Sequence, residues 1–250
     1  MGPKQMYTTG GRPIAIAHRG GALEAIENTL EAFSYAVELG FSYVETDAQL
    51  TRDGVPVAFH DPRLERVSYH TGKISDLTFE QLRNVKIQGT GTISSVSELF
   101  DTFPSTKFNI DAKSDAVLGP LLDVVDEHDA HDRVCIASFY DRRIRRVRKR
   151  FGDSVFTSCG PLELTSLRLP GRRERLTPVA RAAQVPRSIG PIPIITKNFV
   201  DTVHASGRLV HVWTIDDPDA MHDLLDLGVD GIMTDRPSVL KQVMTERQLW

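Results

Sequence analysis

Short runs of apolar and β-branched residues alternate along this chain with longer segments whose apolar positions recur every three or four residues. The first short run covers residues 14–18, and in the segment after it Leu30, Phe33 and Val37 lie on one stripe that ends at Gly40. A stripe with this spacing predicts an amphipathic helix, whereas a short apolar run predicts a buried strand. The chain therefore begins with a strand followed by a helix.

The same alternation continues to the C-terminus. Strands are predicted at 42–49, 55–60, 107–113, 133–138, 154–159, 183–188, 209–215 and 229–234, with a turn at 52–54 between the first two. Helices are predicted near 115–128, 141–151, 197–206, 217–227 and 236–247. Strands that alternate with helices favour a parallel sheet, and a series of such βα units over 250 residues favours closure into a (β/α)8 TIM barrel of the α/β class.

The segment 61–104 is longer than an ordinary connection between a strand and a helix. It follows the second strand, and we expect it to form a small cap-like excursion over the barrel mouth, where loops commonly carry function. No repeat or low-complexity linker interrupts the chain, so we expect residues 1–250 to form a single TIM-barrel catalytic domain.

Charge and hydropathy limit the partners of this chain. The net charge is −3, which gives no general attraction to nucleic acid or to anionic membranes, so a small-molecule substrate is expected. No apolar stretch is long enough to span a membrane, and the N-terminus lacks the apolar run of a secretion signal. Cys135 and Cys159 lie in apolar runs, as buried cysteines do in a reducing compartment. We therefore expect a cytoplasmic protein without a stable membrane anchor.

Charged side chains gather where the predicted strands end. Alternate residues of a barrel strand point inward, and the C-terminal ends of the strands form the active-site face. The residues that this geometry brings to one face are His18, Glu45, Asp47, His60, Asn109, Asp111 and Lys113.

Carboxylates crowded at one barrel mouth repel each other unless a cation compensates their charge. Glu45, Asp47 and Asp111 offer oxygen ligands to a hard divalent cation, which favours Mg²⁺ or Ca²⁺ over zinc. The alternative for Glu45 and Asp47 is a pair of salt-bridged surface carboxylates. Because His18 and His60 bracket them, a functional site is favoured.

The order of several motifs resembles the glycerophosphodiester phosphodiesterase family. The strings that carry the resemblance are HRGGALEAIENTLEAF (18–33), VETDAQLTRDGVPVAFHD (44–61), NIDAK (109–113), Ser138-Phe139, RLVHVWTID (208–216) and GVDGIMTDRP (228–237). It implies metal-dependent hydrolysis of glycerophosphodiesters to sn-glycerol 3-phosphate and an alcohol. The roles that it implies are general acid and base for His18 and His60, metal ligands for Glu45, Asp47 and Asp111, phosphate contacts for Arg19 and Lys113, and apolar walls for Phe139 and Trp213.

The sequence departs from the family pattern at Asp111, where the family usually has Glu. Aspartate is one methylene shorter, so it would bind the metal through water or after a backbone shift. A lysophospholipase D or sphingomyelinase D-like phosphodiesterase is the nearest alternative, and a non-catalytic binding barrel is a further one. The intact Thr51-Arg52-Asp53-Gly54 and His60-Asp61 motifs favour the first assignment. Water and the glycerol 2-hydroxyl both remain possible nucleophiles.

The segment 142–150 is rich in arginine. Ile144, Val147 and Phe151 are spaced three and four residues apart, which predicts the buried stripe of a helix with the arginines on its solvent face. A basic patch that contacts anionic lipid or another acidic partner is the alternative.

Overall fold

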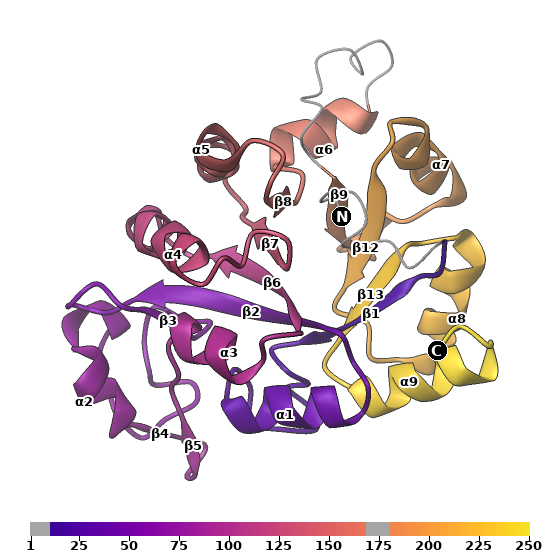
Figure 1. The fold of residues 1–250 in the computed structure, drawn as a ribbon. Coiled ribbons are helices and arrows are strands. Elements are labelled where there is room, and N and C mark those ends of the chain that lie inside the picture. Colours follow the sequence, from indigo (N-terminus) through magenta and orange to yellow (C-terminus); the bar gives the residue numbers. More distant parts are fainter. Residues whose placement is uncertain (1–10, 169–180) are drawn as a thin grey trace.

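Eight parallel strands form a nearly closed barrel with helices around it in the computed structural model, which describes residues 11–168 and 181–250 (Figure 1). The strands follow the order β8-β7-β6-β2-β1-β13-β12-β9. Their bounds are β1 Ile14–His18, β2 Tyr43–Leu50, β6 Lys107–Ala112, β7 Val134–Ala137, β8 Phe156–Thr157, β9 Ala182–Pro186, β12 Leu209–Trp213 and β13 Gly231–Thr234. A parallel bridge between Ser158 and Ala182 joins the two ends of this order. The predicted TIM barrel is therefore confirmed.

The helices connect successive strands on the outside of the barrel (Figure 1). They are α1 Leu30–Glu38, α3 Val96–Thr102, α4 Asp115–Glu127, α5 Asp141–Phe151, α6 Pro161–Arg168, α7 Lys197–Ala205, α8 Pro218–Leu227 and α9 Pro237–Glu246. A Ser, Thr or Asp begins several of them and accepts a hydrogen bond from the backbone N–H three residues later, as Thr29, Ser114, Thr196 and Asp217 do. No helix in the described ranges is long and apolar enough to cross a membrane.

The predicted strand at 55–60 lies outside the barrel. It forms β3, Pro56–Ala58, which pairs with β2 in the antiparallel direction. A turn as short as 52–54 can join only antiparallel strands, because a parallel pair needs a long crossover. The predicted strand at 183–188 begins one residue earlier, as β9.

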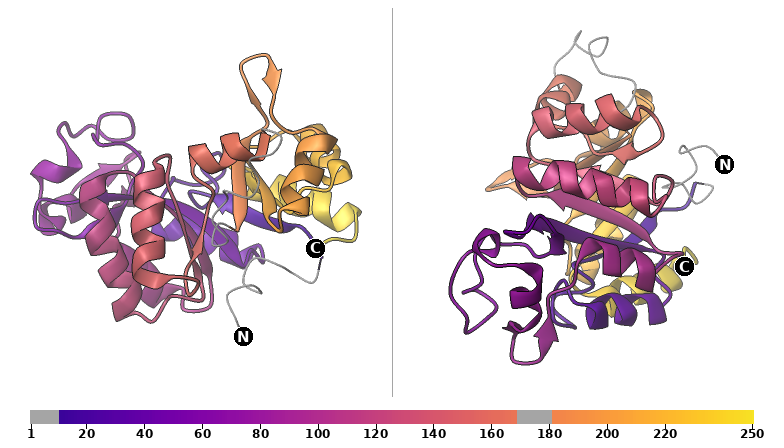
Figure 2. Two further views of the ribbon diagram at one scale, coloured as in Figure 1. Left: turned by 90° about the horizontal axis from the view of Figure 1, so that it is seen from above. Right: turned by 60° about the vertical axis from the view of Figure 1, so that its left-hand side comes forward.

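The segment 61–104 forms a small lobe beside the barrel, on the side of β3 (Figures 1 and 2). Its elements before α3 are the 3-10 turn η2 Ile74–Asp76, α2 Phe79–Arg83, β4 Lys86–Ile87 and β5 Gly91–Thr92. The lobe packs around its own apolar cluster, which includes Leu64, Leu82 and Ile93.

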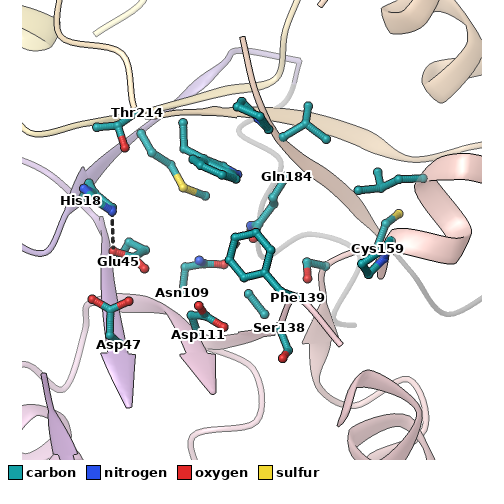
Figure 3. Close-up of a pocket in the computed structure, with 18 of the residues that line it drawn as sticks. His18, Glu45, Asp47, Asn109, Asp111, Ser138, Phe139, Cys159, Gln184 and Thr214 are labelled. Carbon is teal, nitrogen blue, oxygen red and sulfur yellow. Dashed lines mark hydrogen bonds and ion pairs between the residues drawn. The ribbon is translucent and has the colours of Figure 1, made fainter. Parts of the chain in front are cut away.

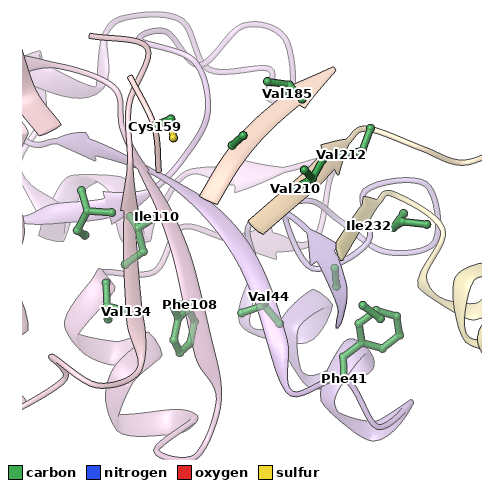
Figure 4. Packing of buried hydrophobic residues seen from close by; sticks show 14 of the residues in the cluster. Phe41, Val44, Phe108, Ile110, Val134, Cys159, Val185, Val210, Val212 and Ile232 are labelled. Atoms are coloured by element: carbon green, nitrogen blue, oxygen red, sulfur yellow. The ribbon is translucent and has the colours of Figure 1, made fainter. Parts of the chain in front are cut away.

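Buried apolar residues form two separate layers. One layer lies between the strands and the surrounding helices, and Figure 4 shows Val44, Phe108 and Val210 among its members. The other fills the inside of the barrel and includes Ile14 and Ile16. Because side chains alternate along a strand, the residues of one strand supply both layers.

Helix α5 confirms the predicted buried stripe, since Ile144 and Val147 are buried. The expectation that its arginines face solvent is wrong for two of them. Arg143 is 7% exposed and donates hydrogen bonds to Asp115 Oδ1 at 2.6 Å and to the carbonyl of Ala112 at 2.9 Å. Arg148 forms an ion pair with Glu163 at 2.8 Å. Arginine is often buried where its planar donors find such partners.

A hairpin follows β9 at the edge of the barrel. Its strands are β10 Ser188–Ile189 and β11 Ile192–Pro193, paired in the antiparallel direction. The hairpin projects away from the barrel in the left view of Figure 2, where it is orange.

Candidate active site

A pocket of about 760 Å³ opens at the C-terminal ends of the barrel strands. The pocket is lined by the two histidines and by five charged side chains, namely His18, His60, Arg19, Glu45, Asp47, Asp111 and Lys113. The pocket is also lined by Phe139 and Trp213, so the structure brings every predicted site residue to one place. Figure 3 shows His18, Glu45 and Asp47 on one side of it and Cys159 on the other.

The strand register explains how residues distant in sequence meet here. His18 stands opposite Glu45 in the pairing of β1 with β2, and Asp47 stands opposite Asp111 in the pairing of β2 with β6. Residues in register on parallel strands are nearest neighbours across the sheet. The two pairings therefore place a histidine and three carboxylates at one rim.

His18 has a carboxylate near each ring nitrogen, and only the one at Nδ1 is within hydrogen-bond distance. Its Nδ1 lies 2.7 Å from Asp235 Oδ1, and its Nε2 lies 3.6 Å from Glu45 Oε2. A carboxylate only accepts, so Nδ1–H donates to Asp235 and Nε2 is left for proton exchange. Burial lowers the pKa of His18, but the charge of Glu45 and the contact with Asp235 outweigh burial, and its pKa is raised.

His60 is oriented by an aspartate in the same way as His18. Its Nδ1 lies 2.7 Å from Asp61 Oδ1, and the guanidinium of Arg66 binds the other oxygen of Asp61. The backbone carbonyl of His60 accepts a hydrogen bond from Gln49 Nε2 at 3.0 Å, which fixes the segment after β3. Both histidines thus have Nδ1 engaged by an aspartate while the ring lines the pocket.

Glu45 and Asp47 are both buried, yet their pKa values are shifted in opposite directions. Burial, and then the charge of Asp47, raise the pKa of Glu45 to about 7. Burial also raises the pKa of Asp47, but Lys113 and Arg19 outweigh it, so that the pKa of Asp47 is lowered. Asp47 is therefore ionised at neutral pH, whereas for Glu45 burial and the charge of Asp47 outweigh the positive charges of His18, Lys113 and Arg19.

Lys113 bridges the carboxylates of Asp47 and Asp111. Its Nζ lies 2.6 Å from Asp47 Oδ1 and 2.8 Å from Asp111 Oδ2. Burial is the first cause of a raised pKa at Asp111, and Lys113 opposes it only in part. Within residues 11–168 and 181–250, no group of three or more His, Cys, Asp or Glu side chains is placed so that it could hold a metal ion.

The segment between β1 and α1 adopts an unusual backbone that serves the site. Arg19 and Asn28 both have a left-handed conformation, with φ of 50° and 58°. The backbone N–H of Arg19 donates to Glu45 Oε2 at 3.2 Å, and the side chain of Asn28 donates to Asp47 Oδ2 at 3.1 Å. Left-handed non-glycine residues cluster at functional sites, where surrounding contacts compensate their strain.

Glycine is required directly after Arg19. Gly20 has φ of +82°, and a Cβ atom there would lie 2.8 Å from the backbone carbon of Ala32. The loop therefore packs against α1 more closely than any side chain permits.

Four site residues were not predicted from the sequence, namely Asp235, Asp61, Asn28 and Glu27. Glu27 accepts hydrogen bonds from Arg19 at 3.1 Å and from Arg66 at 2.7 Å. All four belong to quoted motifs, namely the segments 18–33, 44–61 and 228–237. Their positions inside these motifs could have marked them as site residues. The sequence does not show, however, which histidine or carboxylate each one contacts.

Phe139 and Trp213 form an apolar wall. Their rings meet edge to face, with centroids 5.9 Å apart and an interplanar angle of 82°. Aromatic pairs prefer this geometry because the positive edge of one ring faces the negative face of the other. Figure 3 shows Phe139 between the carboxylates of the pocket and Cys159.

Comparisons with known proteins give consistent matches. A sequence model of the glycerophosphoryl diester phosphodiesterase family matches residues 18–239. The chain is 38% identical to probable glycerophosphodiester phosphodiesterase 2 of Mycobacterium tuberculosis, over 96% of this chain and 94% of that protein. It is 30% identical to a glycerophosphodiester phosphodiesterase of Caldanaerobacter subterraneus, over 92% of this chain and 96% of that protein.

A solved structure has the same fold. It is a phosphodiesterase of Oleispira antarctica in complex with the product sn-glycerol-3-phosphate, and it superposes with a TM-score of 0.79 at 23% identity. The superposition covers 94% of this chain and 97% of that one.

Proposed function

Because the chain belongs to the glycerophosphoryl diester phosphodiesterase family, we propose that it hydrolyses glycerophosphodiesters with His18 and His60 as acid and base and with a bound divalent metal ion. The products are sn-glycerol 3-phosphate and an alcohol. The observation that carries this proposal is the meeting of two aspartate-held histidines and three carboxylates in one pocket.

The two histidines suit the proton transfers of phosphodiester cleavage. An oxygen nucleophile, either water or the glycerol 2-hydroxyl, must lose a proton, and the alcohol leaving group must gain one. Imidazole titrates near neutral pH, and each proton transfer contributes about 10²–10⁴-fold in rate. With Nδ1 bound to Asp235 or Asp61, each ring presents Nε2 for the transfer.

The chemistry of the three carboxylates suits a hard divalent cation, although Lys113 contacts two of them in this structure. Glu45, Asp47 and Asp111 supply only oxygen ligands, and the pKa of Glu45 is raised because burial and the charge of Asp47 outweigh the positive charges of His18, Lys113 and Arg19. We propose that these three residues hold Mg²⁺ or Ca²⁺, with Lys113 as the alternative partner of Asp47 and Asp111. When bound, the ion supplies Lewis-acid stabilisation of the charge on the phosphoryl oxygens.

Two cationic side chains complete the phosphate site in this proposal. Arg19 and Lys113 both line the pocket, and each forms an ion pair with Asp47. Their charges oppose the negative charge that builds up on the phosphoryl oxygens, which is the largest single contribution to many such reactions. Their ion pairs with Asp47 keep both groups oriented before substrate arrives.

A coupled assay for glycerol 3-phosphate release tests this function. Purified protein is incubated with glycerophosphocholine, glycerophosphoethanolamine or glycerophosphoinositol, with Mg²⁺ and Ca²⁺ added separately. Release that requires the protein and a metal supports the proposal. Tight binding of these compounds without turnover, at any metal concentration, would instead identify a non-catalytic binding barrel.

A further inference from the structure

Two amide side chains meet across the inside of the barrel, in the pocket. Asn109 belongs to β6 and Gln184 to β9, and Gln184 Nε2 donates a hydrogen bond to Asn109 Oδ1 at 2.8 Å. Because β7 and β8 separate these two strands in the barrel, the bond spans the interior and does not join neighbours in the sheet. Both residues line the pocket, and Figure 3 shows them between Glu45 and Cys159. We call Asn109 and Gln184 the amide pair.

The bond between the two amides leaves one donor and one acceptor of the pair unused. Asn109 is only 3% exposed, yet its Nδ2 group has no hydrogen-bond partner in the described part of the chain. Gln184 Oε1 has no partner there either. Neither atom is fully enclosed by protein, so both are accessible from the pocket. Burial of an unpaired amide group costs free energy, which indicates that the pair serves a polar ligand.

His211 helps to fix the orientation of Gln184. Burial lowers the pKa of His211 to about 4, so its ring is uncharged at neutral pH and Nδ1 can accept from Gln184 Nε2 at 3.4 Å. With Nε2 engaged by Asn109 and His211, Gln184 offers the pocket its carbonyl oxygen as an acceptor. Asn109, whose own oxygen is occupied, offers its Nδ2 group as a donor. A hydroxyl group matches this pair, because it accepts one hydrogen bond and donates another at the same atom.

The depth of the amide pair indicates which hydroxyl it meets. Asn109 precedes Asp111 by two residues on β6, which places it about 7 Å deeper in the barrel. In the proposed function the phosphate lies at the rim with Arg19 and Lys113. The 2-hydroxyl of glycerol stays close to the phosphate, whereas the terminal hydroxyl lies farther from phosphorus and reaches the depth of Asn109.

We propose that the amide pair binds the terminal hydroxyl of the glycerol moiety, with Asn109 Nδ2 donating to its oxygen and Gln184 Oε1 accepting its proton. The inference rests on the proposed hydrolysis, because the position of the phosphate determines where glycerol lies. Asn109 and Gln184 are then specificity-determining residues. A substrate with this hydroxyl gains two hydrogen bonds, whereas a substrate without it leaves two amide atoms unpaired in the pocket.

Choline esters test the proposal in the wild-type protein, because esterified choline has no free hydroxyl of its own. Glycerophosphocholine is compared with the 2-hydroxypropyl ester of phosphocholine, which keeps the 2-hydroxyl and lacks only the terminal one. Choline release is measured with Mg²⁺ or Ca²⁺ added. We expect kcat/KM for glycerophosphocholine to exceed that for the 2-hydroxypropyl ester at least about tenfold. A smaller ratio would overturn the assignment of the amide pair.

Gln184→Met locates this preference in the amide pair, since methionine keeps the length of the side chain and lacks the amide. The variant is expected to lower kcat/KM for glycerophosphocholine at least about tenfold, and for the 2-hydroxypropyl ester by less than about threefold. Gln242→Met is the matched control, because Gln242 lies on α9 outside the pocket and donates to Glu246 at 2.8 Å. The control should keep both values within about twofold of the wild type.

Asn109→Leu removes the donor of the pair and should show the same selective loss. A purely structural role would lower kcat/KM for both esters by the same factor, and that result would overturn the hydroxyl site while leaving the hydrolysis intact. If neither variant folds, the ratio of the two esters in the wild-type protein decides the question. Absence of choline release from both esters would overturn the proposed hydrolysis, and the hydroxyl site with it.

Discussion

Asp235 accepts a hydrogen bond from His18 Nδ1 at 2.7 Å, although the two residues stand 217 positions apart in the chain. The contact exists because β1 and β13 are neighbours in the barrel, with Ala17 in register with Thr234. The site is therefore complete only when β13, the last strand of the chain, pairs with β1, the first. The orientation of His18 depends on barrel closure as well as on its own motif.

Asp235→Asn is expected to lower kcat at least about tenfold with a smaller change in KM, because the amide no longer selects the tautomer with the proton on Nδ1. Loss of the carboxylate also removes one cause of the raised pKa of His18. The limb of the pH–rate profile that belongs to His18 should therefore move to lower pH. An unchanged profile with reduced thermal stability would show that Asp235 has only a structural role.

His18→Ala and His60→Ala should each reduce kcat at least about 10²-fold while the protein remains folded, because each removes one proton-transfer group. Steady-state kinetics measure the loss, and circular dichroism checks the fold. His128→Ala is a suitable control, since His128 lies at the end of α4 and outside the pocket. Near-native turnover in either of the first two variants contradicts the acid–base assignment.

Removal of metal by EDTA is expected to abolish hydrolysis, and Mg²⁺ or Ca²⁺ should restore it. The reason is that Glu45, Asp47 and Asp111 place carboxylate charge in a buried pocket where oxygen ligands suit a hard cation. Metal content after dialysis is measured together with activity. Asp111→Glu restores the longer side chain that the family usually has, and it should bind the metal at least as tightly as the wild type. Full activity in a metal-free sample would exclude the metal site.

Because His211 is buried with a lowered pKa, the free energy of unfolding should decrease in acid. This residue is fully buried inside the barrel, and burial lowers its pKa from 6.5 to about 4. As pH falls below 6.5 the unfolded chain takes up the proton first, so stability is lost between pH 6.5 and 4 and is unaffected above that window.

The loss from this one group between pH 7 and pH 5 is about 2 kcal/mol in the free energy of unfolding. His211→Gln should show a correspondingly smaller difference between urea titrations at the two pH values. An identical difference in wild type and variant would assign the acid sensitivity to other groups.

Arg143→Met should destabilise the protein by about 1–3 kcal/mol, because the buried carbonyl of Ala112 loses a donor and Asp115 loses an ion pair. Arg146→Met on the exposed side of α5 is the matched control and should change stability by less than about 0.5 kcal/mol. Urea unfolding of both variants measures the difference. Equal changes in the free energy of unfolding of the two variants would mean that the contacts of Arg143 add nothing to its helix propensity.

The alternation of apolar and polar residues was enough to predict most elements and the class of fold. Helices α4 and α5 begin at the predicted residues, because their apolar stripes, and the Ser114 cap of α4, are local properties of the chain. The period of two along β1 and β2 likewise predicted which residues face the barrel interior. The site residues followed from these faces and from the motifs that resemble a known family.

Only the tertiary structure decided which residues meet across the barrel. Local pattern assigns a side chain to a face but does not select the neighbouring strand, because strand pairing joins segments far apart in sequence. For this reason the partners Asp235 and Asp61, the bridging position of Lys113 and the buried state of Arg143 were not predicted. The shape of the pocket has the same origin, since residues of β9, α6 and α7 line it together with the strands that carry the charged groups.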